Sequence, residues 1–209
     1  EQGRSPIVLG GDHSIAAGSI AAVSKKHGGN IGVIWIDAHG DWNNEETTCT
    51  GNMHGMPFSA VCGYGPSCMV EFGQGAVSVN VAHCVQIGGR DIDDLERQRM
   101  AKAGVTVFPI NVIDRLGMGA VIEQAIQIAG DGTDGIHLSF DVDAITPEAV
   151  PGTGVIVYNG LTPREAFLAV ETLAESQKLL SMDMVEVNPF LDTAIKSGIL
   201  ASELVQSAL

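Results

Sequence analysis

Short apolar runs alternate along this chain with segments that have the 3.6-residue period of an α-helix. The runs are apolar on both faces, as strands buried inside a parallel sheet must be. We expect strands at 6–9, 31–36, 84–87, 105–108, 136–140 and 179–187, and helices at 14–27, 94–103, 112–129, 163–175 and 193–208. This alternation predicts a parallel sheet with helices on both faces.

One predicted helix has a clear start signal. Thr162 is a typical N-cap residue, Pro163 suits the first helical position, and Glu165 is spaced to complete a capping box. The helix predicted at 163–175 is therefore expected to begin there.

Composition narrows the class of protein. The 209 residues are 45% hydrophobic, which suits one globular domain spanning 1–209. The 25 acidic residues outnumber the 11 Lys and Arg, and a net charge of −14 has the wrong sign for a nucleic-acid binder. No apolar run is long enough for a membrane span, no secretion signal opens the chain, and the four cysteines lack CxxC spacing. We therefore expect a cytoplasmic protein with reduced thiols and neither nucleic-acid nor membrane partners.

Acidic and imidazole side chains lie in or just after the carboxyl-terminal part of five of the six predicted strands. They are Asp12 and His13; Asp37, His39 and Asp41; Asp91 and Asp93, beside Arg90; Asp141 and Asp143; and Asp183 and Glu186. In an open parallel sheet, ligands bind beyond the carboxyl ends of the strands. Any one of these residues alone has a capping or core role as its alternative, but five such strand ends favour a common site.

The spacing of these residues points to metal ions. In the segments at 37–41 and 141–143 the ligand-type side chains occupy alternate positions, so an extended chain directs them to the same side. With the histidine at 13 they form a set of four carboxylates and two imidazoles: His13, Asp37, His39, Asp41, Asp141 and Asp143. Such oxygen and nitrogen donors suit two divalent ions, Mn²⁺ above all, and the lack of Cys ligands argues against structural zinc.

Three segments resemble the signature segments of the ureohydrolase family, which comprises arginases, agmatinases and formimidoylglutamases. They are GGDHS at 10–14, DAHGD at 37–41 and SFDVDAITP at 139–147. The resemblance implies an arginase-like three-layer α/β/α sandwich with a mainly parallel sheet, two Mn²⁺ ions, and a homotrimer or homohexamer. It implies that His13, Asp37, Asp41 and Asp141 bind one ion, and that Asp37, His39, Asp141 and Asp143 bind the other.

The segment NNEETTCTGNMHG at 43–55 resembles the loop that follows the second metal segment in arginases. This resemblance implies that the substrate is L-arginine, hydrolysed to L-ornithine and urea, and that Asn43, Thr50 and Asn52 bind its carboxylate. His54 is implied as a proton shuttle, since imidazole titrates near neutral pH. Asp93 and Glu96 match positions that receive the α-ammonium group, directly or through water.

The remaining roles concern the guanidinium group. Glu186 stands at the end of an apolar strand, where a buried acid needs a partner, and a guanidinium would provide one. Asp41 is expected to relay a proton during hydrolysis. Asp183 is expected to be a buried structural acid near the metal ions.

Two departures from the arginase pattern leave alternatives open. Thr50 stands where Ser is common, and Val155 stands where a Thr near the guanidinium-binding acid is common. Loss of that hydroxyl removes a hydrogen bond of about 1 kcal/mol. The alternatives are an amidinohydrolase acting on agmatine, a guanidino acid or formiminoglutamate, and a shortened, inactive metal-binding relative with a regulatory role. Relatives normally carry a further strand and helix before GGDHS, so we expect an N-terminal portion to be missing.

Overall fold

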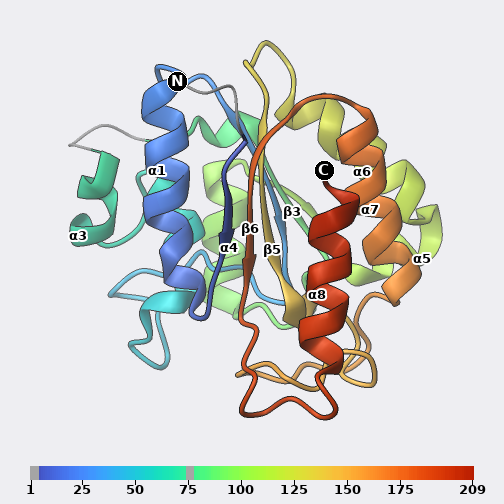
Figure 1. The fold of residues 1–209 in the computed structure, drawn as a ribbon. Helices are drawn as coiled ribbons and strands as arrows, with labels where there is room; N and C mark the ends of the chain where they lie inside the picture. The colour runs from blue at the N-terminus through green and yellow to red at the C-terminus, as the bar shows by residue number, and fades with distance from the viewer. Residues whose placement is uncertain (1–4, 74–77) are drawn as a thin grey trace.

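The structure, a computed structural model, describes residues 5–73 and 78–209. Its centre is a six-stranded sheet in the order β1-β6-β5-β2-β3-β4 (Figure 1). The strands are β1 (Ile7–Leu9), β2 (Gly32–Ile36), β3 (Cys84–Ile87), β4 (Thr106–Phe108), β5 (Ile136–Asp141) and β6 (Leu179–Val185). Every neighbouring pair is parallel, which confirms the predicted type of sheet.

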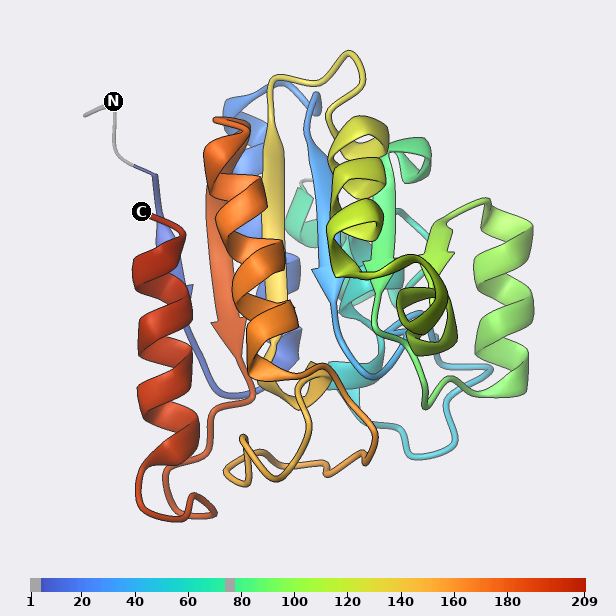
Figure 2. The same cartoon turned by 90° about the vertical axis from the view of Figure 1, so that its right-hand side faces the viewer.

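Helices cover both faces of the sheet. The α-helices are α1 (Ala16–Lys26), α2 (Pro57–Val61), α3 (Ser67–Val70), α4 (Asp94–Ala103), α5 (Ile110–Leu116), α6 (Met118–Ala129), α7 (Pro163–Glu175) and α8 (Lys196–Ser207). Short 3₁₀ turns include η1 (His13–Ile15), η2 (Met53–Gly55) and η5 (Val142–Ala144). Figure 2 shows α6, α7 and α8 side by side on one face, while α1 lies behind the sheet. Within the described residues, no helix has both the length and the apolar character that a membrane crossing requires.

Each face of the sheet has its own apolar core, because successive side chains of a strand point to opposite sides. On one face, Ile34 and Phe140 pack with residues of α6, α7 and α8. On the other, Val33 and Trp35 pack with residues of α1, α2 and α4. The sheet is thus the middle layer of three, as expected.

The helices differ from their predicted positions in several places, including the last one, which begins at Lys196 rather than at residue 193. The helix expected at 112–129 is two helices, because Gly117 between them has a φ of 80°, which residues with a side chain rarely adopt. The helix expected from residue 14 begins as the 3₁₀ turn η1. The short helices α2 and α3 were not predicted, since five and four residues carry too little periodicity to be recognised. The capping box of α7 is confirmed: Thr162 Oγ1 accepts a hydrogen bond from Glu165 N.

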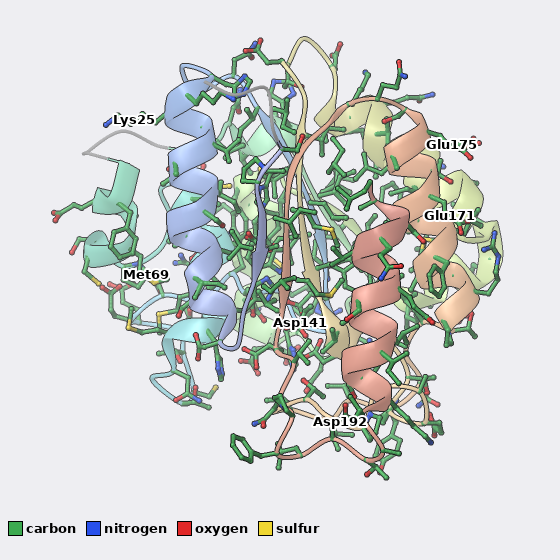
Figure 3. All side chains as sticks on the ribbon, viewed as in Figure 1. Lys25, Met69, Asp141, Glu171, Glu175 and Asp192 are labelled. Carbon is green, nitrogen blue, oxygen red and sulfur yellow. The ribbon has the colours of Figure 1, made fainter. Side chains whose placement is uncertain are left out.

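The strand order reverses direction between β2 and β5. From β2 the chain builds outward through β3 and β4, and it then returns to the other side of β2 with β5 and β6. The loops that leave the neighbouring strands β2 and β5 therefore diverge, and this opens a crevice at their carboxyl ends. Figure 3 shows Asp141 at that end of the sheet.

Candidate metal centre and substrate pocket

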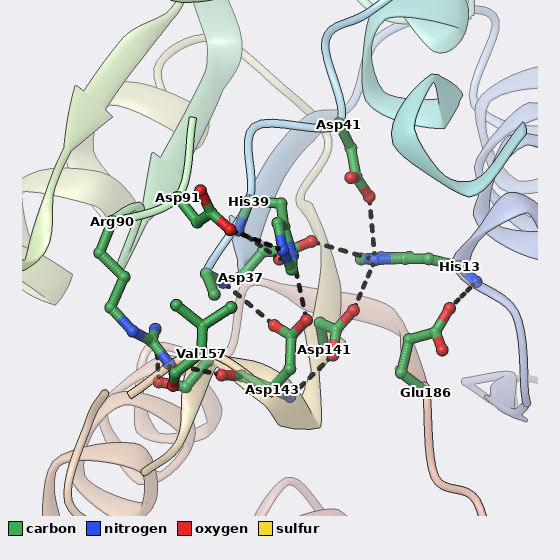
Figure 4. A network of polar contacts seen from close by, with 12 residues as sticks. His13, Asp37, His39, Asp41, Arg90, Asp91, Asp141, Asp143, Val157 and Glu186 are labelled. Atoms are coloured by element: carbon green, nitrogen blue, oxygen red, sulfur yellow. Dashed lines mark hydrogen bonds and ion pairs between the residues drawn. The ribbon is translucent and has the colours of Figure 1, made fainter. Parts of the chain in front are cut away.

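The six candidate ligands lie together at the carboxyl ends of β2 and β5 (Figure 4). The loop after β2 supplies Asp37, His39 and Asp41; β5 and η5 supply Asp141 and Asp143; and η1 supplies His13. The structure thus brings together residues from three segments that are far apart in the sequence, as their strand-end positions predict.

His13 is at the centre of the first group. Its Nδ1 lies 3.1 Å from Oδ2 of Asp37, 3.1 Å from Oδ2 of Asp41 and 3.2 Å from Oδ2 of Asp141. None of these contacts has hydrogen-bond geometry, and Nδ1 is without a hydrogen-bond partner in the described part of the chain. On the other side of the ring, Nε2 lies 2.9 Å from the Ser139 hydroxyl oxygen. With its proton on Nε2, His13 directs a free lone pair at a point that three carboxylates share, which is the arrangement a cation requires.

His39 is at the centre of the second group. Its Nδ1 lies 3.0 Å from Oδ2 of Asp143 and 3.3 Å from Oδ1 of Asp37. Asp37 therefore faces His13 with one oxygen and His39 with the other. Asp141 also lies between the groups, because its Oδ2 faces His13 while its Oδ1 accepts a hydrogen bond of 2.7 Å from Asp143 N. Of these two carboxylates, only Asp37 belongs to both sets of ligand atoms, and Asp141 contacts the second group through the backbone of Asp143.

The charges in this cluster are poorly balanced without cations. Burial opposes the charged form of both imidazoles, but the adjacent carboxylates outweigh it, and they raise the pKa of His13 well above its ordinary value and that of His39 to about 12. Burial raises the pKa of Asp41 and Asp141, and repulsion from neighbouring carboxylates adds to the increase. The cluster thus holds protons that cations would displace. Two sets of three ligand atoms, each set within 4.8 Å, fit two divalent ions.

Two residues that support the ligands were not predicted. The indole of Trp35 stacks on His13 with ring planes 11° apart, and its Nε1 donates a 2.9 Å hydrogen bond to Asp37. Ser139 contacts the other edge of the His13 ring. Trp35 and Ser139 stand two positions before Asp37 and Asp141, on the same face of their strands. That spacing is the sequence signal from which they could have been found.

The turn that carries Asp41 is held by Glu96. One carboxylate oxygen of Glu96 accepts a 2.7 Å hydrogen bond from Trp42 N, and the other accepts one of 3.2 Å from Asp93 N. The turn needs Gly40, since a Cβ atom there would lie 2.8 Å from the Glu96 carboxylate. Burial raises the pKa of Glu96 to about 7. Both oxygens of Glu96 thus accept backbone hydrogen bonds, and the one from Asp93 N belongs to the capping box of α4.

A cavity of about 230 Å³ lies over the ligands. Every candidate site residue except the fully buried Asp37 lines it, namely His13, His39, Asp41, Asn43, Thr50, Asn52, His54, Asp93, Glu96, Asp141, Asp143 and Glu186. Further lining comes from Thr48, Cys49, Asp91 and Val155, of which only Val155 had been considered for a substrate effect. The 43–55 loop and the candidate metal ligands therefore border the same cavity.

Acidic and imidazole groups meet again at the mouth of the cavity. His54 Nδ1 lies 3.4 Å from Oδ2 of Asp12, and Glu186 is the third member of this group. Glu186 Oε1 accepts a 2.8 Å hydrogen bond from His13 N, and burial raises the pKa of Glu186. Elsewhere in the lining of the cavity, Asn43 Nδ2 donates to Asp93 Oδ2 at 3.5 Å. The cavity thus has acids at two separate places, which suits a ligand with two cationic ends.

Asp183 is a buried acid close to the cluster, as expected. It accepts a 2.7 Å hydrogen bond from Ser19 and lies 3.0 Å from Nε2 of His137, whose other ring nitrogen contacts Ser181 at 2.7 Å. Burial opposes ionisation, but His137 outweighs it and lowers the pKa of Asp183. Asp183 thus belongs to a network between β5 and β6, outside the cavity.

Comparisons with known proteins identify the family and the fold of this chain. The family model described as "Arginase family" matches residues 1–209. The chain is similar to the arginase of Bacillus caldovelox, with 44% identity over 207 residues, which cover 99% of this chain and 69% of that protein. It is 48% identical to the arginase of Staphylococcus aureus (strain MRSA252) over 193 residues, which cover 92% of this chain and 63% of that protein. The solved structure of the Bacillus caldovelox arginase superposes with a TM-score of 0.96 at 44% identity, covering 99% of this chain and 69% of that one.

Proposed function

Because this chain belongs to the arginase family, we propose that it hydrolyses L-arginine to L-ornithine and urea with two Mn²⁺ ions. The family expected from the three signature segments is thereby confirmed. One observation carries the proposal: four carboxylates and two imidazoles converge beneath a cavity that the arginase-like 43–55 loop encloses.

The proposed metal ligands divide as the two groups suggest. His13, Asp37, Asp41 and Asp141 would hold one ion, and Asp37, His39, Asp141 and Asp143 the other. Carboxylate oxygens with only one imidazole per ion favour a hard to borderline cation such as Mn²⁺. When bound, such a pair lowers the pKa of a water molecule and stabilises negative charge that develops during hydrolysis.

Glu186 is proposed to bind the guanidinium group. One of its oxygens accepts from His13 N, and the other remains available at the mouth of the cavity. A cationic partner would offset the burial that raises the pKa of Glu186. The hydrogen bond to His13 N fixes this acid relative to a metal ligand, so a bound guanidinium would be positioned over the metal centre.

The amino-acid end of the substrate is proposed to lie beside the 43–55 loop and Asp93, which also line the cavity. Asn43, Thr50 and Asn52 would donate hydrogen bonds to its carboxylate, and Asp93 would receive its α-ammonium group. Thr50 and Asn52 are exposed residues of the loop, and Thr50 Oγ1 accepts a hydrogen bond of 3.1 Å from Asn52 N. Since both oxygens of Glu96 accept backbone hydrogen bonds, Glu96 would contact the ammonium through water.

Hydrolysis breaks one guanidinium C–N bond: the oxygen of water ends on urea, and the departing ornithine amine gains a proton. Asp41 borders the cavity and is proposed to take a proton from water. His54 is proposed to carry a proton to the amine, because it is about one-third exposed and so connects the cavity with solvent.

The test is an assay of urea release in the presence of Mn²⁺ with L-arginine, agmatine and guanidinobutyrate. We expect urea and ornithine from L-arginine. Urea from agmatine or guanidinobutyrate but not from L-arginine would instead support another amidinohydrolase, in which Val155 alters the cavity wall. Two bound ions without turnover of any substrate would support the alternative of an inactive metal-binding relative with a regulatory role. A homotrimer or homohexamer and a cytoplasmic location are further parts of this proposal, and analytical ultracentrifugation would test the assembly.

A further inference from the structure

The guanidinium of Arg90 connects two segments of backbone beside the metal centre (Figure 4). Its Nη2 donates hydrogen bonds of 2.7 Å to the carbonyl oxygens of both Asp143 and Val157. Its Nη1 donates to Ala144 O at 3.1 Å, and its Nε donates to Tyr158 O at 3.0 Å. One side chain thus holds the backbone of a candidate ligand and that of the loop after it.

The backbone of Arg90 adds a third segment. Arg90 N donates a 2.8 Å hydrogen bond to Ala38 O, and Asp91 N donates to the same oxygen at 3.0 Å. Ala38 stands between the candidate ligands Asp37 and His39. Residue 90 therefore joins the loop after β2, the turn after β5 and the 157–158 segment.

These contacts do not serve to pair the charge of Arg90. Among residues 5–73 and 78–209, no carboxylate lies within ion-pairing distance of its guanidinium, although Asp143, Asp37 and Asp141 favour its charge from farther away. The surroundings also leave no space for another group: a Cβ atom at Gly160 would lie 2.6 Å from Arg90 Nη2. A planar fork with five N–H donors fits four carbonyl groups in this way, whereas a lysine ammonium does not.

We propose that Arg90 is a positioning residue for one of the two metal positions, the one formed by Asp37, His39, Asp141 and Asp143. The inference rests on the proposed binuclear centre and extends it. The guanidinium of Arg90 fixes the backbone at Asp143, whereas the contact with Ala38 is made by the main-chain N–H and remains after substitution. It has no contact with His13 or with Asp41, which contribute only to the other position. Its loss therefore affects one ion more than the other.

The test compares wild-type protein with Arg90→Ala, Arg90→Lys and the matched control Arg97→Ala. Arg97 donates a hydrogen bond to Ile92 O and touches neither metal segment. Titration calorimetry and elemental analysis would give the affinity and number of bound Mn²⁺ ions. Electron paramagnetic resonance would separate single Mn²⁺ ions from coupled pairs.

We expect Arg90→Ala to bind the first ion with nearly wild-type affinity and the second about 10- to 100-fold more weakly, the range typical of residues that orient metal ligands. Arg90→Lys keeps the positive charge but not the forked guanidinium, so it should also bind the second ion more weakly than wild type. Arg97→Ala should bind two ions as wild type does.

The inference would be overturned if Arg90→Ala weakened the binding of both ions equally. It would also be overturned if Arg90→Lys bound the second ion with wild-type affinity, or if Arg97→Ala lost as much affinity as Arg90→Ala. If Arg90→Ala does not fold, as judged by circular dichroism without metal, Arg90→Lys decides the result alone. Failure of the proposed binuclear centre has a different signature, since wild-type protein itself would then bind fewer than two ions. Failure of the proposed activity alone would appear as two bound ions without release of urea from L-arginine.

Discussion

Trp35 lies parallel to His13 with ring centroids 4.1 Å apart, and the same indole donates a hydrogen bond to Asp37. One buried aromatic side chain thus orients an imidazole and a carboxylate. Trp35 also stacks on Phe58 at 4.7 Å, so the support continues into the apolar core. The positions of the ligands therefore depend on the packing beneath them.

Replacing Trp35 by Phe should separate the contribution of the hydrogen bond to Asp37 from that of stacking on His13. Phe preserves a ring beneath His13 but leaves the Asp37 oxygen without its donor, which should lower the free energy of unfolding by about 1–3 kcal/mol. Urea denaturation of the metal-free protein would measure this loss. Trp35→Leu removes the stack as well and should be less stable than Trp35→Phe. Equal stability of both variants would contradict a role for stacking.

Metal binding should release protons. His39 has its pKa raised to about 12 and His13 has its pKa raised well above the ordinary value, so both are charged at neutral pH until a cation binds. Binding of Mn²⁺ should then release about two protons per chain from the imidazoles, together with any held by Asp41 and Asp141, whose pKa values are also raised, and the affinity should rise with pH. Titration calorimetry in buffers of different ionisation enthalpy would count these protons. A heat of binding that is independent of the buffer would contradict the prediction.

The sign of the corresponding effect on stability follows from the same pKa. Since the folded pKa of His39 exceeds the unfolded value of 6.5, its charge stabilises the metal-free fold fully below pH 6.5, and this stabilisation is lost as the pH rises through about 12. Bound cations should reverse this trend at alkaline pH, because they require a neutral imidazole. Thermal unfolding with and without Mn²⁺ at several pH values would show the two opposite slopes.

Glu186→Gln tests the guanidinium contact. The amide oxygen can still accept the hydrogen bond from His13 N, so the metal content should remain at the wild-type level. Loss of the charge should reduce transition-state binding by about 2–5 kcal/mol, seen as a fall in kcat/KM for L-arginine. Glu175→Gln, an exposed position on α7 (Figure 3), is the matched control and should leave kcat/KM unchanged. An active Glu186→Gln enzyme would exclude the proposed role.

Glu96 should make stability depend on pH near neutrality. Burial raises its pKa from 4.5 to about 7, so its contribution is fully present below pH 4.5 and is lost as the pH rises through 7. The loss across this window should be about 3 kcal/mol. Glu96→Gln should flatten the pH dependence of the free energy of unfolding, measured by urea denaturation. An unchanged profile would show that another group is responsible.

Much of the site could be predicted because its ligands follow strand ends. Asp37, His39 and Asp41 alternate along an extended segment, and no tertiary knowledge is needed to see that they point the same way. Trp35 could have been found by extending that alternation backwards. The contacts of Arg90 could not, because its partners at 143–144 and 157–158 approach it only when the sheet is assembled.

The limits on predicting the fold have similar causes. Gly117 interrupts a segment whose apolar period continues through it, so periodicity alone predicted one helix where the positive φ of this glycine produces two. The roles of Glu96 depend on the turn at Gly40, whose close approach to the carboxylate is visible only in three dimensions. The alternation of residues in the sequence thus indicates which of them face the site, while the packing of the loops determines their hydrogen-bond partners.

The adjacency of β2 and β5 has a consequence for the order of folding. The loops that leave these strands come from opposite halves of the chain, and the hydrogen bond from Ala38 N to Asp143 joins residues 105 positions apart. The complete cation site therefore cannot exist before the two halves of the sheet have joined. Mn²⁺ should accordingly slow unfolding far more than it speeds folding, because the ions bind the folded protein and not the transition state for folding.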